Sequence, residues 1–193
     1  SNSSFNSVEK DIVVIKLGGA SLLEDSIRNH VLTTIEQYRK YDYTVVLVHG
    51  GGPAINAELT RRGITWEFVN GLRKTTTEMV SVIDEVLSSV NSCLVQDMQS
   101  VNLPAVGMTG TSEILLCRPT NAELGWVGTV EQINIQPILN LIQQPKSVIP
   151  VIAPIGVDIL GNRYNINADW AATKLASALK AKKLIYLTDQ EGI

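Results

Sequence analysis

The chain has 193 residues, of which 45% are hydrophobic and 18% are charged, which is enough for one globular core or the beginning of a second. The net charge of −3 and the lack of a dense lysine or arginine run argue against a nucleic-acid-binding surface. Cys93 and Cys117 lack metal-binding or redox spacing, and no signal peptide or membrane-length apolar run occurs, so we expect a reducing cytoplasm and no membrane partner.

The first structured element is expected to follow a polar tail. Residues 1–11 open with an aperiodic serine-rich stretch and are expected to be disordered or extraneous to the natural protein. Residues 12–17 form a β-branched apolar run typical of a strand buried on both faces. Lys16 lies at the end of this run, directly before Gly18-Gly19. A helix is predicted for 26–41, where apolar residues recur at helical spacing.

The same strand–glycine–helix arrangement occurs a second time. Residues 44–48 are another apolar strand, Gly50-Gly51-Gly52 follow, and 54–62 are predicted to be helical. Glycines without a Cβ let backbone N–H groups approach an anion, and the following helix adds its own unpaired N–H groups and the positive end of its dipole. Two such turns, one with a lysine, indicate a site for several phosphate or carboxylate oxygens.

The rest of the chain continues to alternate strands and helices. Residues 65–69 are predicted to be a hairpin strand ending at Asn70-Gly71. Residues 75–78 fit a capping box that opens a long helix, and Cys93, near the apolar stripe of this helix, is interpreted as a core residue. Further elements are expected in chain order: a short strand at 104–108, a hairpin region at 113–130, a helix at 136–142, a proline-bounded strand at 147–155, a helix at 171–179 and a last buried strand at 184–189. Asp169 is expected to be the N-cap of the last helix.

This alternation predicts an α/β fold with a mostly parallel sheet covered on both faces. Binding sites in such folds lie beyond the carboxyl ends of the strands. The residues expected at these ends are Lys16, Gly18, Gly19, Gly50, Gly51, Gly52, Thr188 and Asp189.

Each candidate residue also has a purely structural interpretation. Lys16 could be a surface residue at a strand end, although a compact ammonium beside two glycines suits a phosphate. Arg73 could be a solvated loop residue or, through its planar fork, a ligand for a substrate carboxylate. Asn165, Asn167 and Asp169 could serve only turns and caps. His49 and His30 show no ligand or nucleophile pattern and are interpreted as structural.

A set of short motifs, in order, resembles one known family. They are Val14-Ile15-Lys16-Leu17-Gly18-Gly19, His49-Gly50-Gly51-Gly52-Pro53, Asn70-Gly71-Leu72-Arg73, Val106-Gly107-Met108-Thr109-Gly110, Gly125-Trp126-Val127-Gly128, Ile152-Ala153-Pro154-Ile155-Gly156-Val157, Tyr164-Asn165-Ile166-Asn167-Ala168-Asp169 and Leu187-Thr188-Asp189. Together they look like the N-acetylglutamate kinases of the amino acid kinase family. The first two are shared across the wider family, whereas the ordered set is specific.

The resemblance implies an open αβα sandwich and a role for each matching residue. Lys16 would contact the transferring phosphoryl group, Asp169 would orient Lys16, and Gly18, Gly19 and Gly51 would hold phosphoryl oxygens. Gly51, Gly52, Arg73 and Asn165 would hold N-acetyl-L-glutamate, and Thr188 and Asp189 would begin the nucleotide pocket. The implied reaction is ATP-dependent phosphorylation of the γ-carboxylate, with Mg²⁺ bound with the nucleotide and no general base, in arginine biosynthesis.

The resemblance has two departures. Lys74-Thr75-Thr76 replaces the family's usual hydrophobic residue, threonine and aspartate beside the substrate lid. The sequence also stops where the nucleotide half should begin, before the family's second catalytic lysine. We therefore expect 12–180 to be the acyl amino acid-binding lobe and 181–193 the start of a nucleotide-binding lobe. The 193-residue chain alone is expected to bind N-acetylglutamate weakly and to be inactive as a kinase.

Two other functions stay open at this point. One is a related kinase acting on carrier-protein-linked aminoadipate or glutamate, against which Asn70-Gly71-Leu72-Arg73 favours the free acetylated amino acid. The other is a non-catalytic module that holds an acyl amino acid. The family also implies a homodimer, and because little chain precedes Ile12 we expect the N-terminal helix of its arginine-regulated hexameric members to be absent.

Overall fold

The computed structural model describes residues 9–18 and 25–187, and its centre is a parallel β-sheet. Five strands lie in the order β11-β1-β2-β8-β5, and every neighbouring pair is parallel. Their bounds are β1 Ile12–Leu17, β2 Thr44–His49, β5 Ala105–Met108, β8 Ile149–Ile152 and β11 Lys183–Leu187. The predicted parallel sheet is therefore confirmed, and all five carboxyl ends lie at one edge.

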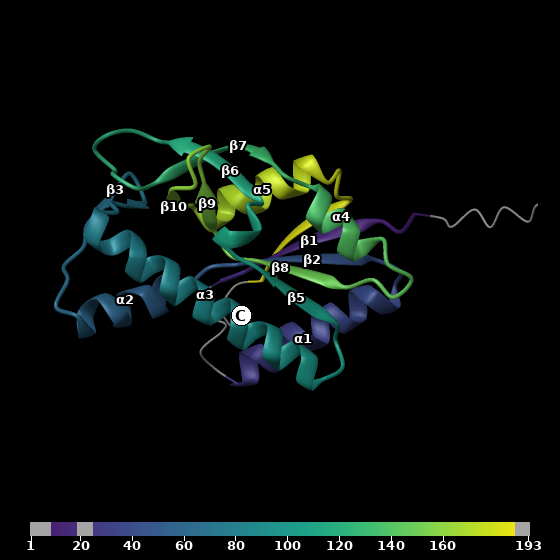
Figure 1. Cartoon of the computed structure of the whole chain (residues 1–193). Coiled ribbons are helices and arrows are strands. Elements are labelled where there is room, and N and C mark those ends of the chain that lie inside the picture. Colours follow the sequence, from purple (N-terminus) through teal and green to yellow (C-terminus); the bar gives the residue numbers. More distant parts are fainter. Residues whose placement is uncertain (1–8, 19–24, 188–193) are drawn as a thin grey trace, which may run out of the picture.

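Helices cover both faces of this sheet (Figure 1). Helices α1 (Asp25–Lys40) and α3 (Thr77–Ser100) pack on one face, against side chains such as Ile15 and Leu47. Helices α4 (Gln136–Ile142) and α5 (Ala168–Ala178) pack on the other, against Val14 and Val46. The β-branched strand runs are buried on both sides, as expected for a parallel sheet. This is the predicted αβα sandwich.

A smaller second sheet lies over the α5 face. Its order is β10-β9-β6-β7, with bounds β6 Leu115–Pro119, β7 Gly128–Ile133, β9 Ile155–Val157 and β10 Arg163–Asn165, and a short 3₁₀ turn, η2 Gly110–Ser112, precedes it. The single strand predicted for 147–155 is wrong. The chain leaves the central sheet at Ala153-Pro154, where proline cannot donate to the ladder, and Ile155 begins the second sheet.

A third part projects beyond the carboxyl ends of β2 and β8. Helix α2 (Gly52–Arg61) packs against α3, and a short hairpin, β3 (Phe68–Val69) and β4 (Leu72–Arg73), follows. Asn70 and Gly71 have φ angles of 51° and 79°, the left-handed conformations that a two-residue hairpin turn needs. The predicted hairpin turn is confirmed, although β3 is shorter than expected.

Several predicted details differ from the structure. The N-cap of α3 is Thr76 rather than Thr75, and the N-cap of α5 is Asn167 rather than Asp169. Cys93 is exposed because it lies beside the stripe of α3 and not within it. Strand β11 is only partly buried because it is the edge of the described sheet. None of the helices in the described ranges has the length and apolar character needed to cross a membrane.

Candidate active site

A pocket of about 360 Å³ lies at the carboxyl ends of β1 and β2. We call it the carboxyl-end pocket. Residues from β1, the β2–α2 turn, the β3–β4 hairpin and the start of α5 line it: Lys16, Gly18, Gly50, Gly51, Gly52, Pro53, Ile55, Phe68, Gly71, Leu72, Arg73, Leu87, Val127, Pro154, Asn165, Ile166, Asn167, Ala168 and Asp169. Seven of the ten predicted site residues are brought together here.

Lys16 and Asp169 form an ion pair at this pocket. Lys16 Nζ lies 3.1 Å from Asp169 Oδ1, and the lysine side chain is 18% exposed whereas the aspartate is 59% exposed. Asn167 supplies the cap of α5 by accepting a hydrogen bond from the Trp170 N–H at 3.0 Å. Asp169, in the first turn of α5, is thereby left to hold the ammonium in place at the end of β1.

The β2–α2 turn brings glycine backbone to the pocket wall. The Gly50 N–H donates to the Leu17 carbonyl at 2.9 Å, which ties the turn to β1. Gly51 precedes α2 and provides no side-chain cap, so the amino end of the helix faces the pocket with its backbone groups. A Cβ on Gly51 would lie 2.5 Å from Leu87 Cδ2, whereas a Cβ on Gly52 would meet nothing within 4 Å.

Arg73 is a buried cation with an unused donor. Its residue is 7% exposed, and its guanidinium carbon lies 4.8 Å from the ring centre of Phe68 and 5.5 Å from that of Trp66. Nη2 donates to Asn56 Oδ1 at 2.7 Å, but Nη1 is buried without any hydrogen-bond partner among the residues that the structure describes. Burial lowers the pKa of the guanidinium from its ordinary value. Such a donor calls for an acceptor from a ligand, since leaving it unpaired is costly.

Asn165 is fixed beside Arg73 by the chain that follows β4. Asn165 Nδ2 donates to Thr75 Oγ1 at 3.3 Å, and that hydroxyl donates to the Arg73 carbonyl at 2.9 Å. The Asn165 N–H donates to the Trp126 carbonyl at 2.9 Å. The Thr75 hydroxyl therefore links two pocket residues, Arg73 and Asn165, although the neighbours of Thr75 depart from the family pattern.

The remaining predicted residues concern the phosphate and nucleotide regions. Gly18 lines the pocket, and its N–H donates to the Leu187 carbonyl at 3.2 Å. Gly19, Thr188 and Asp189 lie outside the residues that the structure describes. Gly18 would have to share its hydrogen with Leu187 in order to hold a phosphoryl oxygen.

Three contributors were missed by the sequence interpretation. Asn56 holds one arm of Arg73 from α2, and Trp66 and Phe68 flank the guanidinium. An asparagine within a helix, and two aromatic residues before and within a short strand, do not by themselves indicate a binding site. Alternation at 65–69 was the only available hint that Trp66 and Phe68 share one side of the chain.

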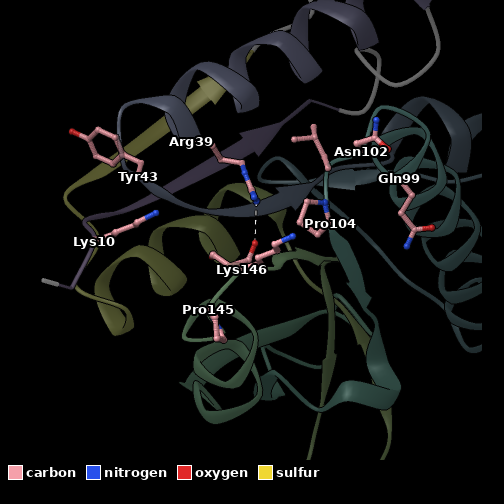
Figure 2. A pocket seen from close by; sticks show the side chains of 10 residues that line it. Lys10, Arg39, Tyr43, Gln99, Asn102, Pro104, Pro145 and Lys146 are labelled. Atoms are coloured by element: carbon pink, nitrogen blue, oxygen red, sulfur yellow. Dashed lines mark hydrogen bonds between the residues drawn. The ribbon is translucent and has the colours of Figure 1, made fainter. Parts of the chain in front are cut away.

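A larger hollow, of about 590 Å³, lies at the opposite edge of the sheet. We call it the amino-end hollow. Figure 2 shows its wall, with Lys10, Tyr43, Lys146 and Arg39, whose Nη1 donates to the Ser147 carbonyl at 3.1 Å. These residues precede or flank the starts of β1, β2 and β8. In parallel α/β sheets ligands bind at the carboxyl ends, so size alone does not make this hollow the active site.

Within residues 9–18 and 25–187, no group of three or more histidine, cysteine, aspartate or glutamate side chains is arranged to hold a metal ion. The polar groups of the carboxyl-end pocket are instead two cations, one carboxylate, backbone N–H groups and two side-chain amides. This set suits an anionic ligand with carboxylate and phosphoryl oxygens.

Residues 11–193 match the model of the amino acid kinase family. Among similar curated proteins, an acetylglutamate kinase of Pelodictyon phaeoclathratiforme is 47% identical over 93% of this chain and 60% of its own length. An acetylglutamate kinase of a Geobacillus species is 44% identical over 94% of this chain and 70% of its own length. The chain thus spans 60–70% of the length of these relatives.

Solved structures agree on the fold. The crystal structure of smu.665 from Streptococcus mutans superposes with a TM-score of 0.87 at 30% identity, covering 96% of this chain and 75% of that one. An N-acetylglutamate synthase from Neisseria gonorrhoeae, complexed with coenzyme A and N-acetyl-glutamate, superposes with a TM-score of 0.80 at 23% identity, covering 95% of this chain and 42% of that one. At the latter identity the likeness concerns the fold alone.

Proposed function

Because the chain belongs to the amino acid kinase family, we propose that its protein uses ATP to phosphorylate the γ-carboxylate of N-acetyl-L-glutamate. The similar curated proteins are acetylglutamate kinases, although the chain spans only part of their length. The product would be an acyl phosphate, N-acetylglutamyl phosphate, and the metabolic setting would be arginine biosynthesis.

The observation that carries this proposal is the unpaired Nη1 of Arg73. It lies at a pocket whose other cation is Lys16, so the pocket offers positive charge at two separate points. A dicarboxylate fits such an arrangement, with one carboxylate on the guanidinium and the other near the ammonium. The amide of Asn165 and the backbone of Gly52 would supply further hydrogen-bonding groups for the acetamido part of the substrate. Gly51 would contact the substrate as well, with its N–H directed to the transferring phosphoryl group.

The reaction needs positioning and charge neutralisation rather than a base. A free carboxylate is already ionised at neutral pH, so its oxygen attacks the terminal phosphorus of ATP directly and ADP leaves. Lys16, held by Asp169, would neutralise charge that develops on the transferring phosphoryl group. The N–H of Gly51, together with Gly18 and Gly19, would donate to phosphoryl oxygens.

The nucleotide would bind along the edge next to β11. We assign the start of its pocket to Thr188 and Asp189, and the acyl amino acid lobe to 12–180, with the nucleotide lobe beginning at 181. Mg²⁺ would arrive with ATP and neutralise phosphate charge. We also propose a homodimer, on the family resemblance alone.

A substrate panel on the complete protein tests the function. ADP release is measured with N-acetyl-L-glutamate, L-glutamate, N-acetyl-L-aspartate and a carrier-linked aminoadipate. The proposal expects the highest kcat/KM with N-acetyl-L-glutamate and a hydroxylamine-reactive acyl phosphate as product. A clear preference for the carrier-linked substrate, or ADP release without acyl phosphate, would overturn it.

A further inference from the structure

A buried histidine lies directly before the glycine turn and takes no part in the chemistry proposed above. His49 is the last residue of β2 and is 0% exposed. Its Nδ1 lies 2.8 Å from the Gly50 carbonyl oxygen, and its Nε2 lies 3.1 Å from Asn91 Nδ2. A side chain with both ring nitrogens engaged in a fully buried place is fixed in orientation.

The partners of His49 define its proton. A carbonyl only accepts, so Nδ1 must carry the hydrogen that reaches Gly50. Asn91 Nδ2 also donates to the Val151 carbonyl at 3.0 Å, which fixes the orientation of the amide, so its second hydrogen points to Nε2, which accepts. The imidazole is therefore neutral and carries its proton on Nδ1. Burial lowers the pKa of His49 to about 4, which agrees with this neutral form.

Asn91 is itself placed by close packing around α3. A Cβ on Gly107, in β5, would lie 2.1 Å from Asn91 Oδ1, so glycine at 107 makes room for the amide. The asparagine, 2% exposed, thus lies between β5, β8 and β2. A buried polar side chain on α3 needs hydrogen-bond partners, and Asn91 finds them in the Val151 carbonyl and the His49 ring.

The hydrogen bond from His49 also fixes a peptide group at the active site. The Gly50 carbonyl and the Gly51 N–H belong to one planar unit and point in opposite directions. With the carbonyl held on the imidazole, the N–H points away from it, on a turn whose glycines line the carboxyl-end pocket. Within residues 9–18 and 25–187 the Gly51 N–H donates to no backbone carbonyl.

We propose that His49, held by Asn91, is a positioning residue that aims the Gly51 N–H at the phosphoryl oxygens in the carboxyl-end pocket. This rests on the function proposed above. The imidazole exchanges no proton with the substrate. It fixes the plane of the Gly50–Gly51 peptide, so that the donor is in place before charge develops and no reorganisation is needed during transfer.

Two substitutions in the complete protein separate this role from simple packing. In His49→Asn the amide nitrogen takes the place of Nδ1 and keeps a donor for the Gly50 carbonyl. In His49→Gln the longer side chain takes the place of Nε2 and keeps a partner for Asn91, but it loses the bond to Gly50. We expect His49→Asn to retain most of kcat, and His49→Gln to lose roughly 10–100-fold with a nearly unchanged KM for N-acetylglutamate. His30→Gln, on the exposed face of α1, is the control.

Equal losses in the two variants, or a raised KM with an unchanged kcat, would overturn the proposal. A second measurement needs neither folding of a variant nor turnover: ¹⁵N spectra of labelled histidine in the unaltered protein should show His49 neutral at pH 7 with the proton on Nδ1. A proton on Nε2 would refute the positioning role. If the unaltered protein does not phosphorylate N-acetylglutamate, the proposed function fails, whereas the spectra still decide the orientation of His49.

Discussion

The two hollows at opposite edges of the central sheet each contain a half-buried or buried arginine, and the two arginines are used differently. Burial lowers the pKa of both guanidinium groups. At the larger amino-end hollow, Arg39 donates Nη1 to the Ser147 carbonyl (Figure 2). At the smaller carboxyl-end pocket, Arg73 is held by Asn56 and two aromatic rings, and its Nη1 has no partner in the described part of the chain.

The comparison shows that volume and positive charge do not by themselves distinguish a candidate binding site, since both hollows have an arginine and the larger one uses it within the protein. Arg39 ties the end of α1 to the chain before β8, which is a structural use of a cation. Arg73 is held in place and still has a donor to offer, which is the arrangement expected of a preorganised binding group. The four predictions that follow test whether chemistry is confined to the carboxyl-end pocket.

The largest effect is expected from Lys16→Ala. Loss of one preorganised charge from the transition state should lower kcat roughly 10²–10³-fold, with a much smaller change in the KM for N-acetylglutamate. Lys146→Ala, at the amino-end hollow, should leave kcat unchanged. Steady-state ADP release measures both. A near-normal kcat with a raised KM would assign Lys16 to ground-state binding instead.

The two arginines can be compared directly by the same substitution. Arg73→Lys keeps the charge but loses the two-pronged geometry, so the KM for N-acetylglutamate should rise by an amount equivalent to about 1–3 kcal/mol. The KM for ATP should change little. Arg39→Lys should alter neither value. Equal changes in the two KM values of the Arg73 variant would point to a role in folding or in the hairpin rather than in carboxylate binding.

Mild acid should weaken the fold through His49 near the carboxyl-end pocket. Its pKa is about 4 in the fold and 6.5 in the unfolded chain, so the unfolded state binds the proton first as the pH falls. The stability contributed by neutral His49 is complete above pH 6.5 and is lost as the pH falls toward 4. Between pH 7 and pH 5 the free energy of unfolding should fall by about 2 kcal/mol.

Urea unfolding at pH 7 and pH 5 measures this loss. In His49→Asn the free energy of unfolding should change less between the two pH values, and the difference should equal the loss expected from His49. His30→Asn, on the surface, should retain the full pH dependence of the unaltered protein. A His49→Asn protein that keeps the full pH dependence would contradict its attribution to His49.

The smallest effects separate two adjacent glycines of the β2–α2 turn. An alanine at 51 would press on Leu87, which is itself buried, so Gly51→Ala should lower the free energy of unfolding by about 1 kcal/mol or somewhat more. In Gly52→Ala the new Cβ lies in open space, so the free energy of unfolding should change by less than about 0.5 kcal/mol. Thermal unfolding of the two variants gives the comparison. A stability loss at 52 that equals that at 51 would show that the backbone, rather than Leu87, requires glycine.

Much of the fold could be predicted from local patterns. The buried strands 12–17 and 44–48 and the helix at 136–142 have runs or spacings whose period is set by the chain itself, and the structure confirms them. The caps were each misplaced. In α3 two consecutive threonines can serve as cap. In α5 Asn167 is the cap, whereas Asp169 pairs with Lys16, a contact across 153 residues of chain that no local preference contains.

The sequence by itself determined the alternating architecture and the two glycine turns, because strand period, helix period and glycine geometry are properties of neighbouring residues. The family was recognised from the ordered set of short motifs, and residues 11–193 match the family model. Only the tertiary structure decided which polar residues are used. Arg73 becomes a binding candidate because Asn56, Phe68 and Trp66 hold it and leave one donor unpaired. His49 becomes more than a core residue because Asn91, from a distant helix, orients its ring toward Gly50. Whether a buried polar atom is satisfied depends on partners that arrive from other elements, and no local pattern contains them.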